Sequence, residues 1–204
     1  MDGFERRRQR KKTEILEASL ELFMNYGVQK VSITEIATKA NVSQVTIYNY
    51  FQSKDNLAHE TIIYYVDKAW EEGLKILESD LSFPEKVKFL IFNKKQAADK
   101  IHEDFYLFMM KEYSGGLSYI EDFYQKRAIP RLIELFNEGR KEGFVDPEIS
   151  NEAILFFIHM IKEYSQREDV YTKILPLTED IMKLLFYGIA GKEKNEKRHT
   201  DLPD

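Results

Sequence analysis

Residues 41–57, NVSQVTIYNYFQSKDNL, carry side chains that can hydrogen-bond an external partner. The polar members at the centre of the segment are Gln44, Thr46, Tyr48 and Asn49. Amide, hydroxyl and phenol groups can bond the edges of DNA bases, and methyl groups can contact thymine. Ser43 is placed to cap a helix whose free N–H groups suit a phosphate, and Lys54 adds a positive charge. The segment therefore has the chemistry of a DNA-recognition helix.

A helical wheel decides which of these side chains face outward. With Ile47 set toward the protein, Phe51 falls about 40° away and Tyr50 about 60° away on the other side. Val45 and Asn49 fall about 160° away, which is the outward direction. The helix is too short to be stable alone, so apolar residues must hold it from behind.

The residues before this segment predict the rest of a helix-turn-helix. A helix from Thr13 ends near Gly27, and a short second helix ends about Ala40. Ser32 and Glu35 are spaced as a capping box at the start of that second helix, with apolar residues at the staple positions. Asn41 occupies the tight turn, where it tolerates a left-handed backbone. After Ser53 the pattern predicts a long helix of about 25 residues.

These residues resemble the DNA-binding domain of the tetracycline-repressor (TetR) family of bacterial transcriptional regulators, over roughly residues 10–60. The residues that carry the resemblance are Ser32, Ala37, Val42, Ser43, Thr46, Tyr48, Tyr50, Phe51, Ser53, Lys54 and Leu57. The apolar residues of the whole chain recur at helical spacing and predict nine or ten helices with no sheet, and the resemblance agrees with an all-α fold of about nine helices. A three-helix DNA-binding domain would cover residues 1–56, and a ligand-binding and dimerisation bundle residues 57–190. Residues 191–204 lack an apolar stripe and read as a disordered tail.

By position, the resemblance assigns roles to individual side chains. Phosphate contacts fall on Ser32 or Thr34, Tyr48 and Lys54. Base or groove contacts fall on Gln44, Val45, Thr46 and Asn49. Asn41 stands where the family often has glycine, and its tolerance of a left-handed backbone accommodates this difference. Val45 also stands where the family often has glycine, so a bulkier group faces the groove and an operator sequence cannot be borrowed from relatives. Tyr50 stands where histidine is frequent, and its hydroxyl could reach a phosphate or simply pack.

Charge along the chain also points to a polyanionic partner at one end. Residues 1–56 hold nine Lys and Arg against seven Asp and Glu, a net of +2, whereas the remainder holds 21 against 28, a net of −7. Six of the basic residues lie between positions 6 and 12. They form either an arm that contacts DNA or a solvated tail.

Several classes of function lack the residues that they need. The chain has no cysteine, and no Gly-rich phosphate loop, HExxH motif or Ser-His-Asp spacing is visible. We therefore expect no enzyme, no cofactor and no metal. No apolar run approaches the roughly 18 residues of a membrane span, so we expect a cytoplasmic protein without a membrane partner.

The C-terminal part is rich in aromatic residues and methionine. Such residues at helical spacing are usually core, whereas the resemblance implies a cavity for a small apolar or aromatic effector. Its candidate lining residues are Trp70, Phe92, Phe105, Phe108, Met109, Phe123, Phe157 and Met160. His102 and His159 are either satisfied core histidines or ligand contacts.

The last two helices, expected at about 148–167 and 176–190, should form a homodimer contact as a four-helix bundle. Its expected core and interface residues are Ile154, Phe157, Ile158, Ile161, Ile181, Leu184 and Leu185. Two recognition helices on a two-fold axis would bind a pseudo-palindromic operator on double-stranded DNA. The alternative is an all-helical protein that binds a small molecule or a partner and does not read DNA.

Overall fold

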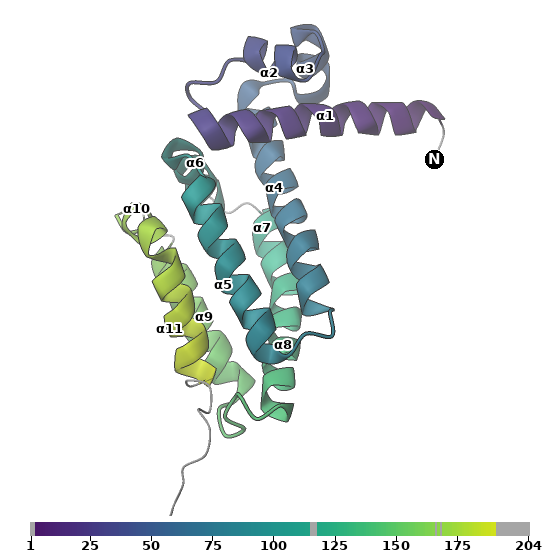
Figure 1. Cartoon of the computed structure of the whole chain (residues 1–204). Helices are drawn as coiled ribbons and strands as arrows, with labels where there is room; N and C mark the ends of the chain where they lie inside the picture. The colour runs from purple at the N-terminus through teal and green to yellow at the C-terminus, as the bar shows by residue number, and fades with distance from the viewer. Residues whose placement is uncertain (1–2, 115–117, 166, 168, 191–204) are drawn as a thin grey trace, which may run out of the picture.

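The computed structural model describes residues 3–114, 118–165, 167 and 169–190, and within these ranges the chain is helical with no strand (Figure 1). The N-terminal elements are α1 (Gly3–Tyr26), α2 (Ile33–Lys39), α3 (Gln44–Phe51) and α4 (Lys54–Leu77). They are followed by α5 (Phe83–Lys100), α6 (Glu103–Ser114), α7 (Ser118–Phe123), the π-helical turn η1 (Tyr124–Ala128) and α8 (Ile129–Lys141). The last elements are α9 (Asn151–Ser165), α10 (Tyr171–Ile174), the 3₁₀ turn η2 (Leu175–Leu177) and α11 (Thr178–Ala190).

The all-α prediction is confirmed. If α7, η1 and α8 are taken as one rod, and the short α10 and η2 are left out, the described ranges form nine helices. The predicted break at Pro130 is a π-helical turn that ends just before α8. Pro130 has no N–H for an i−4 carbonyl, and a widened turn accommodates that loss. The predicted tail at 191–204 lies outside the described residues.

Two boundaries differ from the prediction. The helix α9 begins at Asn151, after a turn that contains Pro147, and the Ser150 hydroxyl accepts the Ala153 N–H at 3.1 Å. The helix α1 begins at Gly3 instead of Thr13, so the basic residues 6–12 are its first turns and not an extended arm. Arg, Lys, Gln and Glu are good helix formers, and nothing between Gly3 and Thr13 breaks the helix.

Apolar side chains gather in two buried clusters. The first contains side chains of α1 to α3, the first turns of α4, and two residues from later helices, Phe105 and Ile120. The second joins α5, α8, α9 and α11, with Phe83, Phe136 and Phe186 among its members. The first cluster thus crosses the expected domain boundary at residue 56, because Leu57 and Ile62 belong to it.

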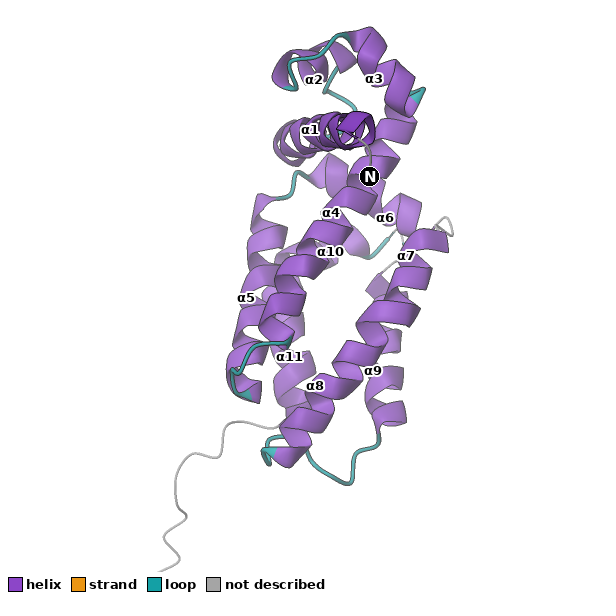
Figure 2. Cartoon of the chain, turned by 90° about the vertical axis from the view of Figure 1, so that its right-hand side faces the viewer, coloured by secondary structure: helices purple, strands orange, loops and turns teal. Residues whose placement is uncertain are grey.

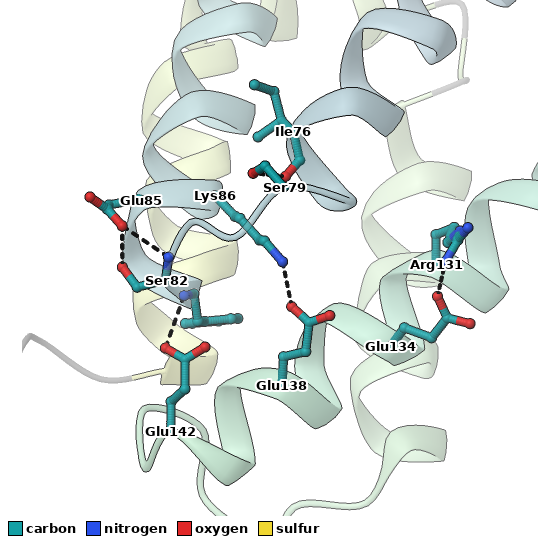
Figure 3. A network of polar contacts seen from close by, with 10 residues as sticks. Ile76, Ser79, Ser82, Glu85, Lys86, Arg131, Glu134, Glu138 and Glu142 are labelled. Carbon is teal, nitrogen blue, oxygen red and sulfur yellow. Dashed lines mark hydrogen bonds and ion pairs between the residues drawn. The ribbon is translucent and has the colours of Figure 1, made fainter.

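Charged side chains link α4, α5 and α8 at the end of the molecule far from α2 and α3, and Figure 3 shows the part of this network between α5 and α8. The Lys86 side chain is almost fully buried, and its Nζ donates to Glu138 at 2.7 Å. Arg131 bonds Glu78 of the α4 C-cap and Glu134 of its own helix, each at 2.5 Å. This network fixes the distal end of α4 against α8.

A second ionic contact joins α5 to α11. Glu179 accepts hydrogen bonds from Lys183 at 2.7 Å and from Lys95 at 2.6 Å. These bonds, the one from Lys183 first, lower the pKa of Glu179 from 4.5 to about 2.

Candidate nucleic-acid interface

The helices α2 and α3 lie on the far side of α1 from the rest of the chain, so one face of them is open (Figure 2). The capping box predicted at the start of α2 is present: the Ser32 hydroxyl accepts the Glu35 N–H at 3.2 Å, and Glu35 accepts the Ser32 N–H at 2.7 Å. The Ser32 hydroxyl also donates to the Glu35 carboxylate at 2.7 Å, and this bond, followed by the one from the Ser32 N–H, holds the pKa of Glu35 below its usual value. Val31 and Ile36, at the staple positions, are both buried.

The turn between α2 and α3 has the predicted geometry. Asn41 has a φ of +50°, in the left-handed region, and the Val42 N–H donates to the Ala37 carbonyl at 2.9 Å. Ala37 itself is buried, as a close helix crossing requires. Behind α3, Ile47 and Phe51 are fully buried, so the short helix is held from the inside.

The outward face of α3 carries the predicted DNA-contacting residues. Gln44, Val45, Tyr48 and Asn49 are exposed, and Val45 keeps 67% of its surface. Thr46 is half-buried, and Ser43 caps the helix by accepting the Thr46 N–H at 3.0 Å. The exposure of Val45 and Asn49 agrees with the helical wheel, which sets them opposite Ile47. Gln44 lies nearer the inward side by angle and is nevertheless exposed, in the first turn of the helix.

Side-chain contacts of two predicted residues, Gln44 and Tyr50, tie α3 to α2 and to α1. The Gln44 amide donates to the Thr34 hydroxyl at 3.0 Å, which joins a predicted base contact to a predicted phosphate contact. The Tyr50 hydroxyl donates to the Arg8 carbonyl of α1 at 3.3 Å, and its ring lies 6.1 Å from that of Phe51. The Tyr50 side chain thus packs against the first cluster, and its hydroxyl is hydrogen-bonded to α1; its contact with a phosphate stays a prediction.

Lys54 begins α4 beside this surface. Its Nζ donates to the Gln29 carbonyl, in the turn between α1 and α2, at 3.2 Å. The N–H of Gln29 in turn donates to Asp104 of α6 at 2.9 Å. Neither Gln29 nor Asp104 was among the predicted site residues. No local pattern could have found them, because they lie 75 positions apart.

The eight candidate effector contacts do not form one group in the structure. Phe105 is fully buried, with its ring 6.0 Å from Phe23, and Phe108 and Met109 pack against the same core. Trp70 and Phe123 meet edge to face at 5.3 Å. The exposed members of the set are Phe92, Phe157 and Met160.

A cavity of about 660 Å³ lies between the start of α4 and one face of α6. Its lining residues are Gln29, Asp55, Asn56, His59, Asp104, Leu107, Phe108 and Lys111. Phe108 is the only candidate effector contact among them. Within the described part of the chain, no group of three or more His, Asp or Glu residues is placed to hold a metal ion. No helix there is long and apolar enough to cross a membrane.

The chain is similar in sequence to known bacterial regulatory proteins. Residues 15–61 match the model of the bacterial regulatory proteins of the tetR family. The chain is 22% identical over 149 residues to the HTH-type transcriptional repressor KstR2 of Mycobacterium tuberculosis (strain H37Rv), which covers 71% of this chain and 74% of that protein. It is 25% identical over 193 residues to the uncharacterized HTH-type transcriptional regulator YhgD of Bacillus subtilis (strain 168), covering 91% of this chain and 98% of that one.

A solved structure shows the same fold over most of the chain. The transcriptional regulator FadR from Bacillus subtilis, in complex with stearoyl-CoA, superposes with a TM-score of 0.55 and 17% sequence identity. The match covers 87% of this chain and 98% of that chain. At this identity the likeness is one of fold.

Proposed function

We propose that this chain, whose residues 15–61 match the tetR family of bacterial regulatory proteins, is a homodimeric, cytoplasmic repressor of that family. It binds a pseudo-palindromic operator and leaves it when a small effector binds. The observation that carries the DNA-binding part is the outward face of α3, where Gln44, Val45, Tyr48 and Asn49 are exposed on a helix held from behind. That face fits a major groove.

Two apolar stripes support a homodimer. The helices α9 and α11 lie on the side of the molecule away from α4 (Figure 1), and exposed apolar residues occur along α9 and along the segment from η2 to α11. These residues are Phe156, Phe157, Met160, Tyr164, Leu177, Leu184 and Tyr187. Their exposed parts amount to on the order of 700 Å² per protomer, taking about 200 Å² for a fully exposed large side chain. A stable interface buries about 800 Å² per partner, so a second copy of the chain matches the stripes.

The predicted interface residues divide into three groups, of which Ile161 and Ile181 form the half-buried one. Phe157 and Leu184 are exposed, and in a dimer they would contact the partner. Ile154, Ile158 and Leu185 are buried within the protomer, where they hold α9 and α11 against α5 and α8. A two-fold axis through the stripes would relate the two copies of α3, as operator half-sites require.

The effector part of the proposal draws on the family and on one solved neighbour. The FadR structure named above holds stearoyl-CoA, an acyl thioester with a long apolar chain. In this chain the half-buried aromatic residues Trp70, Phe108 and Phe123 are the candidate contacts for an apolar or aromatic effector. Binding would favour a spacing of the two α3 helices that no longer fits DNA.

The test begins with selection of an operator from a random duplex library, followed by affinity measurements over a range of salt. Lys54→Ala should weaken binding to all sequences and flatten the salt slope by about one unit per protomer. Asn49→Ala should change the preferred sequence and leave the slope unchanged. Lys75→Ala, which removes the same charge at the other end of α4, is the matched control and should change neither.

A chain that selects no sequence, and whose affinity for duplex DNA does not depend on salt, would refute the proposal. The alternative of a helical protein that binds a small molecule or a partner without reading DNA would then stand.

A further inference from the structure

The first turn of α6 is hydrogen-bonded to the end of α1 and to the turn that follows it. The His102 N–H donates to the Met24 carbonyl in the last turn of α1 at 2.9 Å. Asp104 accepts the Gln29 N–H at 2.9 Å. Gly27 allows this approach, because it has a φ of +81° and any Cβ on it would lie 2.6 Å from the Asp104 carboxylate oxygen.

Gln29 is held on its other side by Lys54. The carbonyl of Gln29 accepts a hydrogen bond from the Lys54 Nζ at 3.2 Å. An ammonium group has three N–H donors, so two remain for a DNA phosphate. Gln29 therefore joins the Asp104 carboxylate of α6 to Lys54, the lysine expected to contact the DNA backbone.

The first turn of α6 is anchored in the core beside Asp104, whereas the Asp104 side chain borders open space. Phe105, next to Asp104, is fully buried and its ring lies 6.0 Å from that of Phe23. Asp104 also lines the cavity of about 660 Å³, so its carboxylate has open space into which it can turn away from Gln29. The contact can therefore open without unpacking the core.

We infer that Asp104 is a positioning residue for DNA binding: it fixes Gln29, and Gln29 in turn holds the Lys54 ammonium in place for a phosphate. The inference rests on the proposed function, because it assumes that Lys54 meets DNA. It adds a residue from outside the helix-turn-helix to the determinants of DNA affinity.

The test compares variants of the full-length chain on a mixed-sequence DNA duplex, since a phosphate contact does not depend on sequence. Asp104→Ala removes the acceptor and should lower affinity by about 2- to 10-fold, the effect of losing one hydrogen bond. Asp104→Asn removes the charge but keeps an oxygen acceptor, so it should bind at least as well as the wild type. Glu103→Ala is the control for charge, because Glu103 is the exposed neighbouring carboxylate.

The direction in which the DNA affinity changes on replacing Asp104 separates a positioning role from a simple charge effect. Loss of a negative charge near DNA should by itself raise affinity, and Glu103→Ala measures that effect. The salt slope of Asp104→Ala should fall toward that of Lys54→Met, and the double variant should bind no worse than Lys54→Met alone. Thermal melts check that each variant is folded. If Asp104→Ala is not folded, Asp104→Asn still tests the inference, because weaker DNA binding by that variant would contradict it.

Three results would overturn the inference. In the first, Asp104→Ala and Lys54→Met weaken binding independently, so that their effects multiply. In the second, Asp104→Asn weakens binding as much as Asp104→Ala does. In the third, Lys54→Met leaves the salt slope unchanged although the chain binds DNA. A wild-type chain that binds no duplex would instead contradict the proposed function itself.

Discussion

A single charge placed in the proposed dimer contact should separate the protomers. Leu184 keeps 72% of its surface within one protomer, so most of its side chain is available to a partner. Burying that fraction contributes about 2 kcal/mol. Because a two-fold axis places the residue in the contact twice, Leu184→Glu should cost about 4 kcal/mol, or about 1,000-fold in the dimer dissociation constant.

Sedimentation equilibrium over a range of concentrations measures this dissociation constant. Phe4→Glu is the matched control, since Phe4 is 65% exposed and lies in the first turns of α1, far from α9 and α11 (Figure 1). It should leave the dimer intact. A Leu184→Glu protein that stays dimeric at the wild-type concentrations, or a Phe4→Glu protein that dissociates equally, would show that the stripes on α9 and α11 are not the contact.

Three further predictions concern stability. Glu138→Ala leaves the buried Lys86 ammonium without its carboxylate and should cost about 1–3 kcal/mol in urea unfolding, whereas Lys86→Met should cost under about 1 kcal/mol. Equal losses in the two variants would contradict this account. Asn41→Val places a β-branched residue at a φ of +50° and should cost about 1–2 kcal/mol, while Asn41→Gly should not destabilise; thermal melts of the pair decide it. Because hydrogen bonds from its two lysine partners lower the pKa of Glu179 from 4.5 to about 2, its stabilising contribution is complete above pH 4.5 and is lost as the pH falls toward 2. Glu179→Gln should reduce the loss of stability in that window, and an unchanged pH profile would argue against the contribution.

Local features of the DNA-binding domain could be predicted from the sequence because they depend on residues a few positions apart. The capping box of Ser32 and Glu35, the left-handed turn at Asn41 and the hydroxyl cap at Ser43 all occur as predicted. The outward direction of Val45 and Asn49 followed from the helix period. Each of these features is fixed by backbone geometry within one or two turns, so its signal is contained in a short segment.

Features that join distant segments depended on the tertiary structure. The contacts of Gln29 with Asp104 and of Lys86 with Glu138 link positions 75 and 52 apart. A hydrogen bond between such positions leaves no periodic trace in either segment. The sequence also does not predict which aromatic residues are buried, because a helix with apolar residues on several sides can bury any of them. Phe105 is buried whereas Phe92 keeps 53% of its surface, because the packing of the helices against one another selects which face lies inside.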